Sequence, residues 1–181
     1  MIQVRSNTFE TNSSSSHSIV LLSKETSDDE DYFKCFLTKE GLFKIWYEED
    51  LEFGRCPFNV LSTFVDKVRY AIASYGGSRF EEIEDLCRKY LVQAYFNPEY
   101  IGYCTGIELP VDRWSHKYFG DIDHQSIGLL DGALKEFKIS LEEFLINPRY
   151  IVIIDGDEYK IFDKMFECGI IDSNTVEKRF N

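Results

Sequence analysis

A run of hydroxyl side chains beside a histidine is the part of the sequence best suited to chemistry. In chain order it consists of Thr11, Asn12, Ser13, Ser14, Ser15, Ser16, His17 and Ser18. Such a segment can hold an anion, or it can supply a serine nucleophile beside a general base. A catalytic triad also needs a carboxylate that orients His17, and Glu10 is too close in sequence to be a convincing choice. A solvated serine-rich loop between two strands explains the same residues without any chemistry.

Two aspartates and a histidine form a second candidate site. Asp121, Asp123 and His124 lie close together in the sequence, and with a further histidine they have the donor atoms to hold a divalent cation. The alternative is a helix start, in which Asp123 or Ser126 caps the backbone and His124 is exposed in the first turn. We favour the helix start and expect no bound metal and no cofactor. If the protein is an enzyme, the segment Ser13–His17 with Asp123 and His124 would act on a phosphate-containing small molecule.

Sequence motifs of the common nucleotide-binding and hydrolytic sites are absent. There is no Gly-Lys-Ser/Thr after a glycine-rich turn, no G-x-G-x-x-G, no G-x-S-x-G and no H-E-x-x-H. The five cysteines are scattered and form no C-x-x-C pair. This usage favours reduced thiols in a cytoplasm, where cysteine packs as a small apolar residue.

Acidic residues form the third notable feature. The chain has 32 Asp+Glu against 20 Lys+Arg, which is a formal net charge of -12. This charge disfavours nucleic-acid binding by a basic surface and favours a target that is itself basic. One acidic run consists of Asp28, Asp29, Glu30 and Asp31, and a second consists of Glu48, Glu49, Asp50 and Glu52. Solvated faces that keep the protein soluble are the alternative explanation.

The elements that must position these residues are those of an α+β protein. Alternation and turn residues predict strands at 2–5, 18–22, 32–37, 42–47, 100–109 and 149–154, the last of them central. Apolar residues at three- and four-residue steps predict helices at 58–75, 80–94, 127–137, after Ser140 and near 157–166. We expect Ser78 with Glu81, and Ser140 with Glu143, to form capping boxes. We infer a single α+β domain over residues 1–181, with a small antiparallel sheet, a helical hairpin and additional C-terminal helices.

The two acidic runs flank one predicted β-hairpin, formed by 32–37 and 42–47 around the turn at Gly41. Both runs are therefore expected to emerge at one end of that hairpin. Trp46 and Tyr47 lie directly before the second run and can serve as aromatic anchors for a partner.

A membrane location is not expected. The longest purely apolar run, 150–154, is far shorter than the roughly 20 residues of a spanning helix. The N-terminus turns polar after Arg5 and lacks the apolar region of a signal peptide. The sequence favours a cytoplasmic protein.

The segment Phe9–Ser18, with the sequence FETNSSSSHS, resembles a group of small acidic proteins encoded by phages and mobile elements of Gram-positive bacteria. Those proteins open with a similar arginine, followed by Phe-Glu-Thr-Asn-Ser-Ser-Ser and a histidine. The stretch Asp123–Ser126 is similar to that group as well. The group has no agreed catalytic role, so the resemblance assigns no active-site residue.

Within that setting, the length and charge are similar to those of anti-CRISPR proteins that inhibit type II effectors such as Cas9. Such inhibitors are often acidic, single-domain and non-enzymatic, and several block a groove that binds nucleic acid. Cas9 holds its nucleic acids in positively charged channels, which suit an acidic partner. The resemblance implies a phage-derived inhibitor in the cytoplasm of the bacterial host, which binds a basic protein such as a Cas9-type nuclease and blocks DNA engagement. Asp28–Asp31, Trp46, Tyr47 and Glu48–Glu52 are the expected contacts, and the enzyme remains the alternative.

Overall fold

The apolar run near residue 150 forms an interior strand of the largest sheet. The computed structural model describes residues 16–23, 31–54, 59–122, 126–155 and 176–179, and in it this run is β9 (Tyr150–Asp155). The side chains of Ile151, Val152, Ile153 and Ile154 are all buried, so both faces of β9 are covered. The prediction of a central strand is confirmed. The strand predicted at 2–5 and the helix predicted near 157–166 lie outside the described residues.

Contacts between residues divide the chain into two compact units. Of the described elements, unit 1 contains β1, β5, α3, α4, β9 and β10, and unit 2 contains β2, β3, η1, β4, α1, α2, β6, β7 and β8. Together they confirm the predicted α+β class with a small antiparallel sheet, a helical hairpin and further helices. The prediction that the chain is one domain stays a prediction. Among the helices described, none has the length and apolar character needed to cross a membrane.

Unit 1 is built on one antiparallel sheet with the strand order β10-β1-β9-β5. Its strands beside β9 are β1 (Ser16–Leu21) and β5 (Asn59–Leu61), and β10 (Val176–Arg179) pairs with the other side of β1. Two helices, α3 (Leu129–Phe137) and α4 (Leu141–Ile146), supply aromatic rings that contact Tyr150 of β9. Apolar packing on a continuous hydrogen-bonded ladder therefore holds this unit together.

The starts of α3 and α4 test the predicted caps. α4 begins as expected, because the Ser140 hydroxyl accepts a hydrogen bond from the Glu143 backbone N–H. The expectation that Asp123 or Ser126 caps α3 is wrong, since the residue before the helix is Gly128. Gly128 has a φ of 79°, a left-handed conformation that glycine adopts without steric cost.

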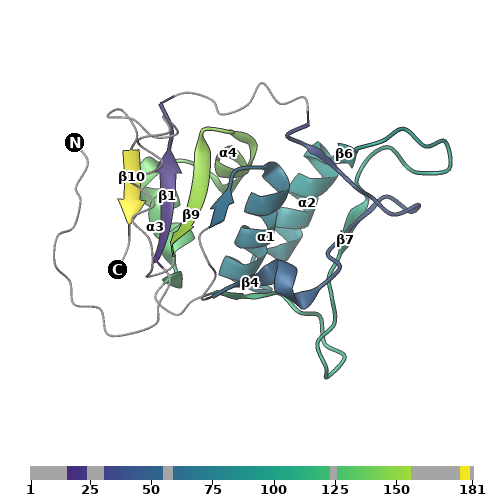
Figure 1. Cartoon of the computed structure of the whole chain (residues 1–181), viewed down its shortest axis with the longest axis horizontal. Coiled ribbons are helices and arrows are strands. Elements are labelled where there is room, and N and C mark those ends of the chain that lie inside the picture. Colours follow the sequence, from purple (N-terminus) through teal and green to yellow (C-terminus); the bar gives the residue numbers. More distant parts are fainter. Residues whose placement is uncertain (1–15, 24–30, 55–58, 123–125, 156–175, 180–181) are drawn as a thin grey trace. The chain divides into compact units, whose positions relative to one another are not determined.

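Unit 2 contains the helical hairpin, α1 (Phe64–Tyr75) and α2 (Phe80–Tyr90), which contact each other and are joined by a glycine-containing turn (Figure 1). α1 begins later than predicted because residues 59–61 pair with β9 as β5, and Thr63 and Asp66 then form a capping box. The predicted box of Ser78 and Glu81 is wrong. Arg79 precedes α2, and the Ser78 hydroxyl instead donates to the carbonyl of Tyr75, which closes the preceding turn.

Three short parallel strand pairs surround this hairpin in the sequence. They are β2 (Lys34–Cys35) with β6 (Val92–Gln93), β3 (Leu42–Lys44) with β7 (Gly106–Glu108), and β4 (Glu52–Phe53) with β8 (Asp121–Ile122). Parallel strands need a long crossover connection, and here the chain through α1 and α2 supplies it.

The β-hairpin predicted at 32–47 is correct only in its turn. The Thr38 N–H donates to the Leu42 carbonyl, and Leu37 and Phe43 form one antiparallel bridge. The strands on either side then pair with β6 and β7 rather than with each other. A two-stranded hairpin is marginal alone, and pairing with later strands adds a hydrogen-bonded neighbour to each arm.

Candidate functional site

The register of β4 and β8 places acidic residues from two distant segments side by side. Glu52 lies opposite Asp121 in this pair, and Glu48 belongs to the short 3-10 helix η1 (Glu48–Leu51) that directly precedes β4. The pKa of the nearby Tyr118 hydroxyl is affected by the charges of all three carboxylates. Its pKa is raised, first by partial burial and then by the carboxylates of Glu52, Asp121 and Glu48, and it hydrogen-bonds to Glu52.

Leu51 and Gly120 set the position of this acidic segment. Leu51 is fully buried at the end of η1 and fixes the short helix to unit 2. Gly120 has a φ of 104°, and a Cβ built on it would lie 2.7 Å from the Leu51 carbonyl oxygen and 2.9 Å from the Ala73 Cβ. Because only glycine fits this close approach, the residue directly before β8 determines how near Asp121 comes to Glu52.

The acids of this segment differ in how they are compensated. Asp50 lies 3.2 Å from the Arg69 guanidinium and is half-buried, so it is neutralised within the protein. Glu48, Glu49 and Asp121 form no ion pair with another described residue. Their charges are therefore available to a partner.

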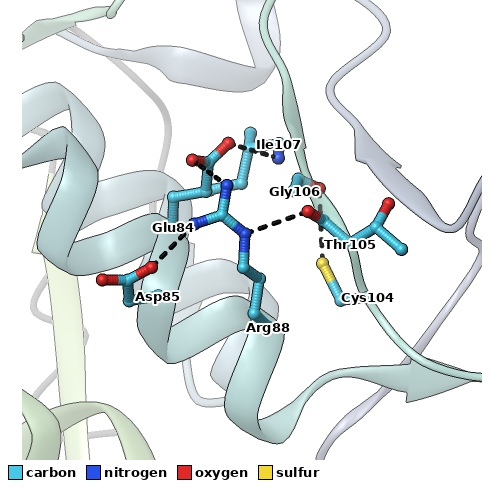
Figure 2. A network of polar contacts seen from close by, with 7 residues as sticks. All are labelled: Glu84, Asp85, Arg88, Cys104, Thr105, Gly106 and Ile107. Carbon is cyan, nitrogen blue, oxygen red and sulfur yellow. Dashed lines mark hydrogen bonds and ion pairs between the residues drawn. The ribbon is translucent and has the colours of Figure 1, made fainter.

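Glu84 and Asp85 of α2 are compensated instead. Figure 2 shows Arg88 bonded to Glu84, to Asp85 at 2.6 Å and to the Thr105 carbonyl oxygen at 2.9 Å. The second carboxylate oxygen of Glu84 accepts the N–H of Ile107, so this network ties α2 to β7. These acids hold the fold together and are poor candidates for a binding surface.

Two exposed aromatic residues lie directly before the uncompensated acids. Trp46 is 62% exposed and Tyr47 is 68% exposed. We call this region the acidic aromatic surface, and it consists of Trp46, Tyr47, Glu48, Glu49, Glu52 and Asp121. Exposed aromatic rings beside uncompensated charge are typical of protein-binding surfaces.

An open groove of about 470 Å³ adjoins the acidic aromatic surface. Its lining comes from two segments, and comprises Lys44, Ile45, Trp46, Tyr47, Glu48, Glu49, Glu108, Leu109, Pro110 and Val111. The parallel register of β3 and β7 sets Lys44 opposite Glu108, and the two form an ion pair at 2.5 Å. The Lys44 Nζ also lies 4.9 Å from the centre of the Trp46 ring. The groove thus already holds a cation on an aromatic face.

Most of the first acidic run, namely Asp28, Asp29 and Glu30, lies outside the described residues. Its described member, Asp31, pairs with Lys34 at 2.8 Å. The prediction that both acidic runs emerge at one end of the hairpin stays a prediction.

His17 does not lie in a solvated loop. It is only 3% exposed, and it belongs with Ser16 to β1, where it pairs with Ile154. The ladder between β1 and β9 continues to Asp155, which draws these two residues into the sheet. Ser13, Ser14, Ser15, Asp123 and His124 lie outside the described residues, so the catalytic arrangement stays a prediction.

Metal and thiol chemistry find no support in the described part of the chain. No group of three or more His, Cys, Asp and Glu residues there has the arrangement of a metal site. Cys35, Cys87 and Cys104 are free thiols, and burial raises the pKa of each, that of Cys35 to about 12. These thiols are protonated and unreactive at neutral pH, as packing residues would be.

Part of this surface was predicted from the sequence, namely Trp46, Tyr47 and the run from Glu48 to Glu52. Asp121 was instead assigned to the candidate metal site, and the pairing of Glu108 with Lys44 was not predicted. Only the register of the parallel pairs joins these residues, and nothing in the sequence pattern specifies that register.

Comparison with known proteins adds no family to this description. The chain matches no protein-family model, no curated protein and no solved structure.

Proposed function

We propose that the protein is a phage-derived inhibitor of the anti-CRISPR type, which binds a basic nucleic-acid-handling protein, such as a Cas9-type nuclease, and blocks DNA engagement. One observation carries the proposal. Carboxylates from η1, β4 and β8 converge beside the exposed Trp46 and Tyr47, and three of them have no cationic partner among the described residues.

Charge complementarity explains how such a surface would inhibit. A duplex carries one negative charge per roughly 1.7 Å, so a protein channel that holds it is lined with cations. Clustered carboxylates are attracted to that channel and accelerate the encounter. Aromatic side chains supply the desolvated contact area that makes the complex long-lived. Together these groups would occupy the channel and exclude DNA.

Pull-down from a bacterial host lysate, and with a purified Cas9-type nuclease, tests the proposal. We expect capture at low salt and little capture at high salt, because exposed charges are screened. The Glu48→Lys/Glu49→Lys variant should lose capture and inhibition of DNA cleavage. Glu81→Lys/Glu136→Lys is the matched control, since it changes the net charge equally at exposed positions that are not among the residues of this surface.

Trp46→Ala tests the aromatic part of the same surface. Trp46 is exposed, so its removal should weaken capture while leaving the unfolding midpoint unchanged. The proposal is rejected if the control variant loses as much inhibition as the surface variant, or if salt has no effect on capture.

A further inference from the structure

The groove beside Trp46 combines two kinds of group that bind a guanidinium, aromatic rings and carboxylates. Trp46 and Tyr47 offer exposed aromatic faces, and Glu48 and Glu49 offer carboxylates without a described cationic partner. The volume of about 470 Å³ lies within the range of about 300–1,000 Å³ that is typical of ligand pockets. An aromatic face with carboxylates at its rim is complementary to a planar cation.

Lys44 shows that the groove already stabilises a cation. Its ammonium group lies over the Trp46 ring and pairs with Glu108, which is the neighbour that the β3–β7 register provides. The Lys44 and Glu108 side chains are half-exposed, so a cation from outside can reach both the ring and the carboxylate. An incoming cation would therefore compete with Lys44 for the same two groups.

We infer that this groove takes an arginine side chain from an extended basic segment of a partner protein, and that Lys44 occupies the place of that arginine when the partner is absent. The inference rests on the proposed function, since it names the side chain that the basic partner presents. Arginine is favoured over lysine because its flat guanidinium stacks on an aromatic ring and donates two parallel hydrogen bonds to a carboxylate.

Direct binding can be measured through Trp46. The chain has two tryptophans, so Trp114→Phe leaves Trp46 as the single indole reporter. A capped peptide in which three arginines alternate with serines should change its emission in a saturable, salt-sensitive way. The same peptide with citrulline, which keeps the shape and lacks the charge, should give no change. The lysine peptide should bind more weakly than the arginine peptide.

Substitutions at the Lys44–Glu108 pair give the sharpest test, because the two residues should have opposite effects. Lys44→Met removes the competitor and should strengthen arginine-peptide binding about two- to five-fold, the equivalent of one exposed cation–π contact. Glu108→Gln should weaken binding, since the arginine loses a carboxylate. Lys39→Met and Glu81→Gln are the controls, since they make the same charge changes at exposed positions that do not line the groove. If the controls change binding as much as the substitutions at the pair, the effect is one of overall charge and the inference is overturned.

The two proposals fail in different ways. If the arginine peptide binds as described but no nuclease is captured, the groove is an arginine site and the proposed function is wrong. If the nuclease is captured through Glu48 and Glu49 but the peptide and its lysine and citrulline forms behave alike, the inference is overturned and the proposed function stands.

Discussion

The two units differ in where they place large apolar side chains. Ten such side chains are exposed among the described residues, and all but Ile127 belong to unit 2. Unit 1 buries its apolar residues on a four-stranded antiparallel sheet. Unit 2 also has a buried apolar core, in which Phe64, Tyr70 and Ile83 of the helical hairpin take part, but its strand pairs are only two or three residues long. The difference therefore lies at the surface: both units have buried cores, and in the described residues nearly all the exposed large apolar side chains belong to unit 2.

The largest effect is expected in the core of unit 1. Ile153 is fully buried in β9, so Ile153→Ala should lower the free energy of unfolding by about 2–5 kcal/mol. Ile127→Ala, at an exposed position of the same unit, should change it by less than about 0.5 kcal/mol. Urea unfolding followed by circular dichroism measures both. Equal effects of the two substitutions would contradict the assigned burial.

The same variant tests whether the units form one domain. Both tryptophans lie in unit 2, so their fluorescence follows that unit, whereas circular dichroism follows the whole chain. For a single domain, Ile153→Ala shifts both signals by the same amount. A fluorescence midpoint that stays in place while the circular dichroism midpoint falls would show two separate domains.

A smaller loss of stability is expected in unit 2 at the glycine before β8. Gly120→Ala forces a left-handed conformation and a clash with Leu51, which should cost about 1–3 kcal/mol. Gly102→Ala is the control, because a Cβ at that position meets open space. Gly120→Ala should also reduce capture of a basic partner, since Gly120 positions Asp121. If Gly120→Ala were as stable as the unsubstituted protein, Gly120 would not lie as close to Leu51 as the structure places it.

The network between α2 and β7 should contribute less. Glu84→Ala removes bonds to Arg88 and to the Ile107 N–H, which should cost about 1 kcal/mol because the site is near the surface. Glu81→Ala, in the same helix and exposed, should be nearly neutral. Chemical unfolding of both variants compares them. If Glu84→Ala were as neutral as Glu81→Ala, the network of Figure 2 would not stabilise unit 2.

The smallest effect is a pH dependence at the acidic aromatic surface. The pKa of Tyr118 is raised above the ordinary value near 10 by partial burial and by Glu52, Asp121 and Glu48. The protonated phenol is therefore favoured by folding, so its contribution is complete below about pH 10 and is lost as the pH rises through the folded pKa. Glu52→Gln should lower the pH at which Tyr118 ionises, measured as phenolate absorbance against a Tyr118→Phe reference. An unchanged titration would place Glu52 away from Tyr118.

Elements with strong local signals were predictable from sequence. The strand at 150–155 and the Ser140 cap depend on an uninterrupted apolar run and on a local side-chain hydrogen bond, and both are visible in the sequence. The helical hairpin followed from apolar spacing, although its first helix begins only at Phe64. The pairing partners of the short strands were not predictable, because two or three residues carry too little pattern to select a register.

The residues of the candidate site likewise fall into a group that was predictable from local sequence and a group that was not. Trp46, Tyr47 and the acids that follow are adjacent in sequence, so composition alone identified them. Asp121 and Glu108 join them through pairing across more than sixty residues, Lys44 with Glu108 and Glu52 with Asp121. A long-range register of this kind depends on the packing of the intervening helices, which no local pattern encodes.

The order of the strands also has a consequence for synthesis on the ribosome. All described elements of unit 2 have been translated once Ile122 is made, so the acidic aromatic surface and the groove beside it can form early. β1, in contrast, is translated first among the described strands but pairs only with β9 and β10. At roughly 5–20 residues per second, β1 waits on the order of ten seconds with its apolar edge unpaired. A nascent chain arrested before β9 would therefore carry a folded acidic aromatic surface and an aggregation-prone strand at the same time.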